Sequence, residues 1–292
     1  MKIVSRIFTG IIFVFLFAPI VVLLLFSFNV SKSTAVFEGF SFYWYKELFH
    51  NSEALGALFN TVFLAVCATA ISTVLGTAAA VGIQKIRSRW YKSALNTVTN
   101  IPITNPDIIT GISLMLMFVF VGRLFGAGTS LNFGTMLIAH ITFCTPYVIL
   151  EVLPKLQQMD PALPEAAMDL GCPPLRAFFK VVLPEIRTGI VTGAIMAFTL
   201  SLDDFVISYF TTGTGFTTLP IYIYSMTKKK VTPDMYALAA IIFAVSLTLL
   251  LVSNVVSNDD SRKLREHRCR KRMAKRHAEA EAERAAKAAK QQ

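Results

Sequence analysis

Charged side chains are scarce in this sequence. Only 16% of its 292 residues are Asp, Glu, Lys or Arg, whereas soluble domains carry about 25%. The chain also contains no G-x-x-x-x-G-K-[ST] phosphate loop and no H-E-x-x-H, G-x-S-x-G or G-x-G-x-x-G pattern. These absences argue against an ATPase of that kind, a membrane protease, a hydrolase and a dehydrogenase. The four cysteines show no metal-ligand spacing, so we expect no metal centre and reduced thiols.

Long runs of apolar residues make up much of the sequence. The chain is 54% hydrophobic and has a mean hydropathy of +0.57. A helix of roughly 20 apolar residues crosses the hydrocarbon core of a bilayer. Six runs have that length, at about 4–28, 58–83, 103–122, 133–153, 186–209 and 236–256. The sequence therefore predicts an all-α integral membrane protein with six transmembrane helices, in which residues 1–257 form the membrane domain.

The distribution of Lys and Arg predicts how the chain is oriented. The N-terminal apolar run is longer than the roughly 7 to 15 residues of a secretory signal, and no small-x-small cleavage site follows promptly, so we expect an uncleaved first span. Most of the 28 Lys and Arg residues lie in alternate loops and in the C-terminal tail. By the positive-inside rule, this asymmetry predicts that both termini are cytoplasmic.

Residues 258–292 form a basic tail, from which most of the net charge of +10 comes. Basic residues beside a last span favour anionic lipid headgroups by about 1 kcal/mol each. The second half of the tail is rich in Ala, Glu and Lys, but it has no apolar face to bury. We expect a flexible or partly helical cytoplasmic tail that lies against membrane lipid, and no nucleic-acid-binding domain.

Small residues recur at every fourth position in the second and fifth runs. Such stripes let helix backbones approach closely in lipid, so we expect both spans to pack against other helices. The two stripes are Ser72, Gly76 and Ala80, and Gly189, Gly193 and Ala197. In the fourth run, His140 has no second histidine or cysteine at ligand spacing, so we interpret it as an interhelical hydrogen-bonding residue.

A polar, proline-rich segment at about 154–185 separates the fourth and fifth runs. Asp160 followed by Pro161 predicts a helix start, and Gly171 predicts its end. After two prolines, apolar residues recur at helical spacing as one stripe, which we expect to lie against the base of the membrane domain. The members of this stripe are Leu175, Phe178, Phe179 and Val182. The pattern predicts two short helices joined at a glycine corner, the first of them presented to the cytoplasm.

The same segment resembles the cytoplasmic loop of the permease subunits of bacterial ATP-binding-cassette importers. That loop reads E-A-A, three residues, Gly, nine residues and I-x-L-P. Four residues match it in place, Leu183 and Pro184 complete it, and Val181 stands where isoleucine is usual. The four are Glu165, Ala166, Ala167 and Gly171. The resemblance implies the type I importer permease fold, with a coupling helix between the fourth and fifth spans.

The resemblance also implies partners and a mechanism. An ATPase dimer would bind the coupling loop and all of the ATP, so this chain would be a transport subunit, not an enzyme, without a cofactor of its own. A second permease subunit and an extracytoplasmic solute-binding protein would complete the machine in the bacterial cytoplasmic membrane. The residues implied for ATPase coupling are Glu165, Ala166, Ala167, Asp169, Gly171, Leu183 and Pro184.

Three further stretches look like the second permease subunit of spermidine/putrescine importers. They are NPDIITGISLMLMF (105–118), FTLSLDDFVISYFTTG (198–213) and LPIYIYSM (219–226). This resemblance implies a polyamine cargo. Related permeases carry ferric iron, thiamine or phosphonates, so a different solute stays an alternative. Two alternative classes of protein are an ion-coupled secondary carrier and a membrane-anchored interaction protein that acts through its basic tail.

Asp203 and Asp204 are the strongest candidates for a cation pathway. A carboxylate inside a membrane costs roughly 2.5 to 3.5 kcal/mol, so it normally faces a cavity or a partner. Adjacent helical residues point about 100° apart, so we expect only one of the two to face the path. Bonds to backbone or to a neighbouring span are the alternative. Tyr209 and Trp44 are candidates for cation–π contacts with ammonium groups, although an interfacial aromatic belt also explains such residues.

Overall fold

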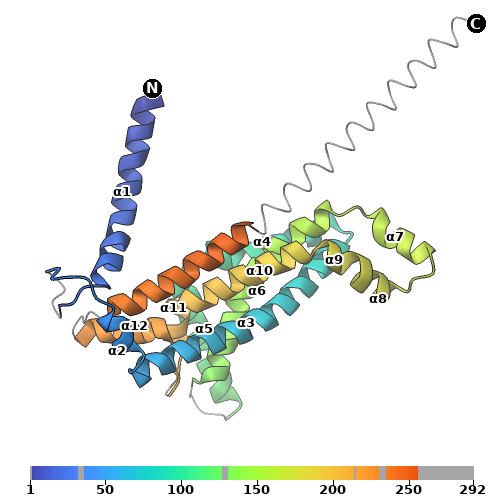
Figure 1. Ribbon diagram of the computed structural model, residues 1–292. Coiled ribbons are helices and arrows are strands. Elements are labelled where there is room, and N and C mark those ends of the chain that lie inside the picture. Colours follow the sequence, from blue (N-terminus) through green and yellow to red (C-terminus); the bar gives the residue numbers. More distant parts are fainter. Residues whose placement is uncertain (1, 32–35, 127–130, 214, 230–234, 256–292) are drawn as a thin grey trace, which may run out of the picture.

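A computed structural model of the chain describes residues 2–31, 36–126, 131–213, 215–229 and 235–255 (Figure 1). In these ranges the regular structure is helical, apart from an isolated bridge between Asn29 and Phe40. The helices in chain order are α1 (Lys2–Phe26), α2 (Tyr43–Leu48), α3 (Ser52–Lys85), α4 (Arg89–Thr104), α5 (Asp107–Leu124), α6 (Phe133–Gln158), α7 (Ala162–Asp169), α8 (Pro174–Ala177), a π-helix (Phe178–Val182), α9 (Leu183–Glu185), α10 (Arg187–Asp203), α11 (Val206–Thr211), α12 (Leu219–Lys229) and a last helix, Met235–Val255.

The predicted set of six spans is confirmed, with corrections at two of them. Five described helices are long and apolar enough to cross a membrane: Arg6–Phe26 within α1, then α3, α5, α6 and Met235–Val255. The sixth candidate is α10 together with the short helices before it, which are bent by 68° at Ile186. The predicted tail at 258–292 lies outside the described residues.

The third span begins later than the predicted 103–122. Residues up to Thr104 belong to a separate helix, α4, and the membrane-spanning helix begins at Asp107. Between them, Asn105 and Pro106 have extended backbone. Proline disfavours helical backbone in the residue before it, so the apolar run is cut at this point.

The fifth span ends earlier than the predicted 186–209. Its helix, α10, stops at Asp203, Asp204 has extended backbone, and the chain re-enters a helix at Val206. The seventeen residues of α10 span about 25 Å. The break places both aspartates at a helix junction and not in the middle of a continuous helix.

Three long helices, α3, α6 and α10, pack against one another to form the core. The two predicted stripes of small residues are buried, and both face α6. A Cβ added at Gly76 would lie 2.7 Å from Cβ of Val148, and one added at Gly193 would lie 3.3 Å from Cα of the same valine. The expected packing of both stripes within the chain is confirmed.

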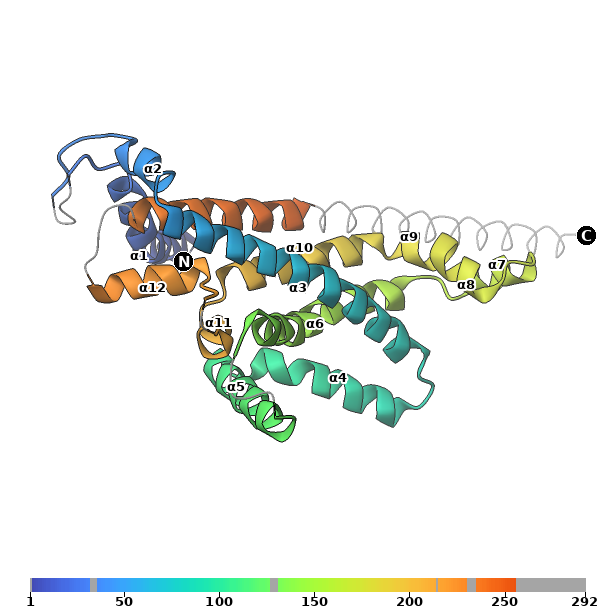
Figure 2. The same cartoon turned by 90° about the horizontal axis from the view of Figure 1, so that it is seen from below.

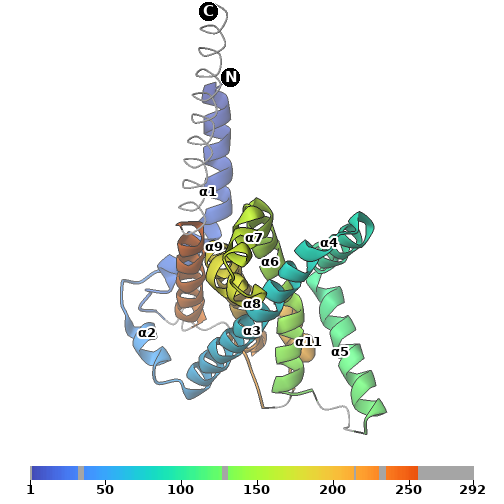
Figure 3. The same ribbon diagram turned by 90° about the vertical axis from the view of Figure 1, so that its right-hand side faces the viewer.

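The first helix stands away from this core (Figures 1 and 3). None of the residues of Arg6–Phe26 is buried within the chain. The base of the helix is fixed by ring contacts of Phe26 with Phe37 and Tyr236. An apolar helix of this length needs a nonpolar environment, which the chain itself does not supply.

The two ends of the molecule differ. The polar segment that contains α7, α8 and α9 lies at one end of the helix bundle, and α2 and α12 lie at the other (Figures 1 and 2). Helix α6 begins beside the end of α11, where Oγ1 of Thr135 donates to the carbonyl of Thr211, and leads to the coupling loop. Two candidate sites, the coupling loop and the α10–α11 break, therefore lie along the same three packed helices.

Candidate functional site

The loop at 160–185 begins with the predicted helix. Oδ1 of Asp160 accepts a hydrogen bond from the backbone N–H of Ala162 at 3.1 Å, so Asp160 satisfies one of the free amides at the start of α7. The helix ends just before Gly171, whose φ of +83° is left-handed. Beyond it, the N–H of Cys172 donates to the carbonyl of Ala167 at 3.1 Å. The glycine corner is confirmed, since a residue with a Cβ is strained at this φ.

The second half of the loop departs from the predicted stripe. After α8, residues Phe178–Val182 form a π-helix, which has more residues per turn than an α-helix. Helical spacing of 3.6 residues therefore does not hold, and the stripe is divided. Ala177 and Val182 are buried, whereas Leu175 and Phe179 are exposed. The prediction that all four apolar residues face the membrane domain is wrong for these last two.

The residues implied for coupling lie on an accessible surface. Most of them are exposed and two, Ala167 and Leu183, are half-buried. Leu170 is 89% exposed, and Leu163 and Met168 on α7 are exposed as well. The exposed members of the coupling set are Glu165, Ala166, Asp169, Gly171 and Pro184. Several apolar side chains exposed together are typical of a surface that binds another protein.

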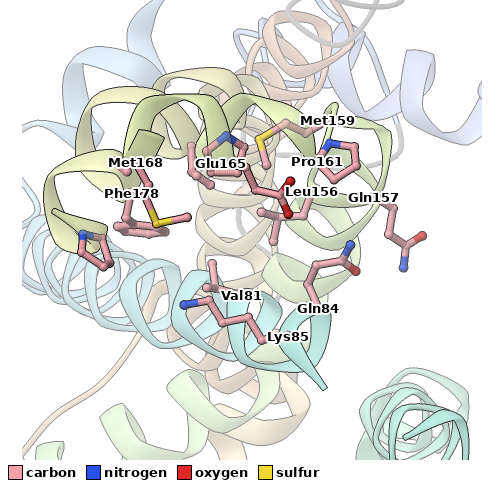
Figure 4. A pocket seen from close by; sticks show the side chains of 14 residues that line it. Val81, Gln84, Lys85, Leu156, Gln157, Met159, Pro161, Glu165, Met168 and Phe178 are labelled. Carbon is pink, nitrogen blue, oxygen red and sulfur yellow. The ribbon is translucent and has the colours of Figure 1, made fainter. Parts of the chain in front are cut away.

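A cavity of about 430 Å³ lies between this loop and the ends of α3 and α6. In Figure 4 the carboxylate of Glu165 is directed into the cavity, and Gln84 and Lys85 of α3 form the wall below it. Nζ of Lys92 donates to Oε1 of Gln84 at 2.9 Å. Glu165 thus lies between the exposed face of α7 and the base of the helix bundle.

Both carboxylate oxygens of Asp204 accept hydrogen bonds from backbone amides at the α10–α11 break. Its Oδ1 accepts from the N–H of Ile207 at 3.2 Å and its Oδ2 accepts from the N–H of Ser208 at 2.7 Å. These amides would otherwise be unsatisfied at the start of α11. For Asp204, this geometry is the predicted alternative, in which the carboxylate bonds to backbone.

His140 of α6 links the helices on both sides of the break. Its Nδ1 lies 2.8 Å from Oγ of Ser201 on α10, and its Nε2 lies 3.0 Å from Oγ of Ser208 on α11. Nε2 also lies 3.6 Å from Oδ2 of Asp204. The expected interhelical role of His140 is confirmed. The two serines that complete the network carry no signal in the sequence, because serine is common in apolar spans.

The remaining pathway candidates lie in two separate places. Asp203 is exposed at the end of α10. Tyr209, four residues after Phe205, contacts that ring and the ring of Tyr224. Trp44 belongs instead to α2, where its indole is buried and Nε1 donates to the carbonyl of Asn29 at 2.8 Å. The structure thus brings Asp203 and Tyr209 to one helix break. Trp44 lies apart from them, and its indole is held by a hydrogen bond to the carbonyl of Asn29.

Residues 72–262 match the model of one protein family, the binding-protein-dependent transport system inner membrane component. The chain belongs to this family. It is therefore a multi-pass permease of the inner membrane and a transport subunit, not an enzyme. The structural comparison agrees: the chain resembles, with a TM-score of 0.67 and 18% identity, a solved bacterial ABC transporter involved in the import of alginate, over 88% of this chain and 95% of that one.

Two relatives of the permease are more similar in sequence. It is 37% identical to the putrescine transport system permease protein PotI of Escherichia coli K12 over 255 residues, which cover 87% of this chain and 91% of the relative. It is 34% identical to the spermidine/putrescine transport system permease protein PotC of Haemophilus influenzae over 254 residues, or 87% and 96% of the two chains. The permease thus spans nearly the full length of both.

Proposed function

We propose that this permease carries polyamines across the membrane as one of two permease subunits. An extracytoplasmic binding protein delivers the cargo, and a separate ATPase dimer binds and hydrolyses all of the ATP. The observation that carries the choice of cargo is the identity of 34–37%, over almost the whole chain, to permeases named for putrescine and spermidine. The exposed carboxylate of Asp203 lies two residues before Phe205 in the chain, and negative charge is chemically suited to a polycation.

The ATPase surface in this proposal is the exposed side of α7. Leu163, Met168 and Leu170 provide apolar contact area there, while the Gly171 corner fixes the direction in which the helix projects. Glu165 lies at the inner edge of this surface, where it faces the cavity (Figure 4). A displacement of α7 by the ATPase would therefore reach the ends of α3 and α6 directly.

In this proposal the second permease subunit packs against α1. The apolar side chains of α1 are exposed along the whole span, so a neighbouring subunit or lipid must cover them. The orientation follows from the coupling loop: α7 faces the cytoplasm and the ATPase, and α2 and α12, at the opposite end, face the binding protein. The uneven distribution of Lys and Arg supports this orientation, with both termini cytoplasmic.

The test is uptake of labelled putrescine and spermidine into proteoliposomes that contain the permease, its second permease subunit, the ATPase and the binding protein. Each cargo is measured with and without ATP. Wild type is compared with Glu165→Ala, with Gly171→Pro and with the control Glu185→Ala, which removes an exposed carboxylate from α9. We expect ATP-dependent uptake that both α7 variants lose and the control retains, with all complexes assembled.

The alternatives give different results in the same assay. A different cargo is indicated if neither polyamine is taken up but iron, thiamine or phosphonate stimulates ATP hydrolysis. An ion-coupled carrier predicts uptake that follows an ion gradient in the absence of the ATPase. An interaction protein that acts through its tail predicts that removal of residues 262–292 abolishes function, whereas the proposed mechanism predicts that uptake persists.

A further inference from the structure

Three aromatic rings from two helices meet beside the α10–α11 break. The centroid of Phe205 lies 5.5 Å from that of Tyr209 and 4.7 Å from that of Tyr224. The two tyrosine centroids are 5.8 Å apart, and their planes are nearly perpendicular, at 81°. We refer to Phe205, Tyr209 and Tyr224 as the ring cluster. It joins the start of α11 to α12, at the end of the bundle opposite α7 (Figure 2).

The ring cluster is accessible. Tyr209 is 43% exposed and Tyr224 is 37% exposed, whereas the next tyrosine on α12, Tyr222, is buried. The exposed carboxylate of Asp203 lies two residues before Phe205 in the chain, so the same junction also carries negative charge.

An ammonium group already lies on this cluster. Nζ of Lys228 is 4.6 Å from the centroid of the Tyr224 ring, within the roughly 6 Å at which the face of an aromatic ring attracts a cation. A hydrogen bond with Tyr224, together with the nearby phenol groups, raises the pKa of Lys228. The site thus favours the charged form of a primary amine on an alkyl chain, which is also the chemistry of each end of a linear diamine.

We propose that the ring cluster binds one primary ammonium group of the cargo, and that the Lys228 ammonium holds this site when cargo is absent. The proposal rests on the polyamine function proposed above and names the residues that recognise the amine. An internal lysine limits occupancy of the site to molecules that displace it. A neutral solute, or one with a single negative charge, has no means of doing so.

The ring contribution is tested by equilibrium binding of labelled putrescine to the assembled permease and ATPase complex in nanodiscs, without the binding protein. Removing the ring by Tyr224→Leu is expected to weaken binding by about 2- to 30-fold. The matched variant Tyr224→Phe keeps the ring and is expected to bind at least as tightly as wild type, since a cation–π contact needs no hydroxyl group and the hydrogen bond that holds Lys228 is lost. Butylamine should compete with putrescine and butanol should not.

The role of Lys228 is tested by removing its charge. Lys228→Gln is expected to tighten putrescine binding by about 2- to 30-fold, because the internal competitor is lost. The control is Lys46→Gln on α2, outside the ring cluster, which removes the same charge and is expected to leave binding unchanged. Equal tightening in both variants would show that Lys228 acts only through the net charge of the protein. It would overturn the proposal that Lys228 competes with the cargo for the ring cluster.

Uptake with the full system separates failure of this inference from failure of the proposed function. If wild type takes up no polyamine in proteoliposomes, the proposed function fails, and the inference fails with it. If wild type takes up putrescine but the isolated complex does not bind it, the ring cluster is not a cargo site. The same conclusion follows if Tyr224→Leu and Tyr224→Phe bind putrescine equally well.

Discussion

Nε2 of His140 lies 3.6 Å from Oδ2 of Asp204, and this contact joins the first half of α6 to the residue that caps α11. The same imidazole contacts Ser201 and Ser208. A single side chain thereby fixes the end of α10 and the start of α11 relative to a third helix. The break in the fifth span is held by this polar network, which is buried in the core of the chain.

Replacing His140 by Leu should therefore lower the stability of the helix junction. Hydrogen bonds between membrane helices contribute about 0.6 kcal/mol on average and up to about 1.7 kcal/mol, and this variant removes two. We expect a clear fall in the thermal midpoint of the detergent-solubilised permease. The control is Thr142→Val, two residues along on an exposed part of α6, where only a hydrogen bond to the helix's own backbone is lost. Equal midpoints in the two variants would contradict a role for the network.

The two aspartates should separate into a structural and a transport residue. Asp204→Ala leaves two amides of α11 unsatisfied, and loss of such a cap costs about 1 kcal/mol, so we expect reduced thermal stability and less assembled complex. Asp203→Asn removes an exposed charge, and we expect normal assembly with slower polyamine uptake. Thermal midpoints and initial uptake rates, measured on both variants, check this assignment. Normal uptake by well-expressed Asp203→Asn would remove Asp203 from the pathway.

The glycine corner of the coupling loop should tolerate Asn better than Val. Gly171 has a φ of +83°, which asparagine adopts more readily than other residues with a Cβ, and a β-branched residue hardly at all. We expect Gly171→Val to lower the number of polyamine molecules imported per ATP hydrolysed, and Gly171→Asn to retain most of it. Both ratios are measured in the same proteoliposomes. A Val variant with unchanged coupling would show that the direction of α7 does not depend on this corner.

Two glycines of α3 provide a matched test of the core. A Cβ at Gly76 would lie 2.7 Å from Val148 and 3.2 Å from the carbonyl oxygen of Thr145, whereas one at Gly82 meets nothing within 4 Å. Overpacking of a core costs about 1 to 3 kcal/mol. We expect Gly76→Ala to lower the thermal midpoint and Gly82→Ala to leave it unchanged or slightly higher. Similar midpoints would mean that α3 and α6 separate without cost.

Local sequence signals predicted the coupling loop well because each acts within a few residues. Asp160 caps its own helix start, and Gly171 supplies a φ that other residues avoid. The stripe at Leu175 and Phe179 failed for a different reason. A π-helix changes the number of residues per turn, and the apolar sequence Phe178–Val182 carries no signal that distinguishes a π-helix from an α-helix.

The break at Asp203 and Asp204 could not be predicted from the surrounding residues. No proline or glycine lies within this stretch of the apolar run, and the usual signals for a helix end are missing. The break is stabilised by the His140 network, in which His140 is more than sixty positions away from Ser201 and Ser208 in the sequence. Contacts at that distance arise only when α6 and α10 have packed together.

Helix α6 has 26 residues, a length of about 39 Å, and its partners are distributed along all of it. Near the loop, Lys155 and Glu151 press against Gly189; at mid-length, Val148 fills the space beside Gly76 and Gly193. Close packing of this kind has little compressibility, so we expect the three helices to move as one rigid unit. Under the proposed function, a displacement of α7 at the cytoplasmic face tilts this unit, and with it the cap of α11 at the outer face.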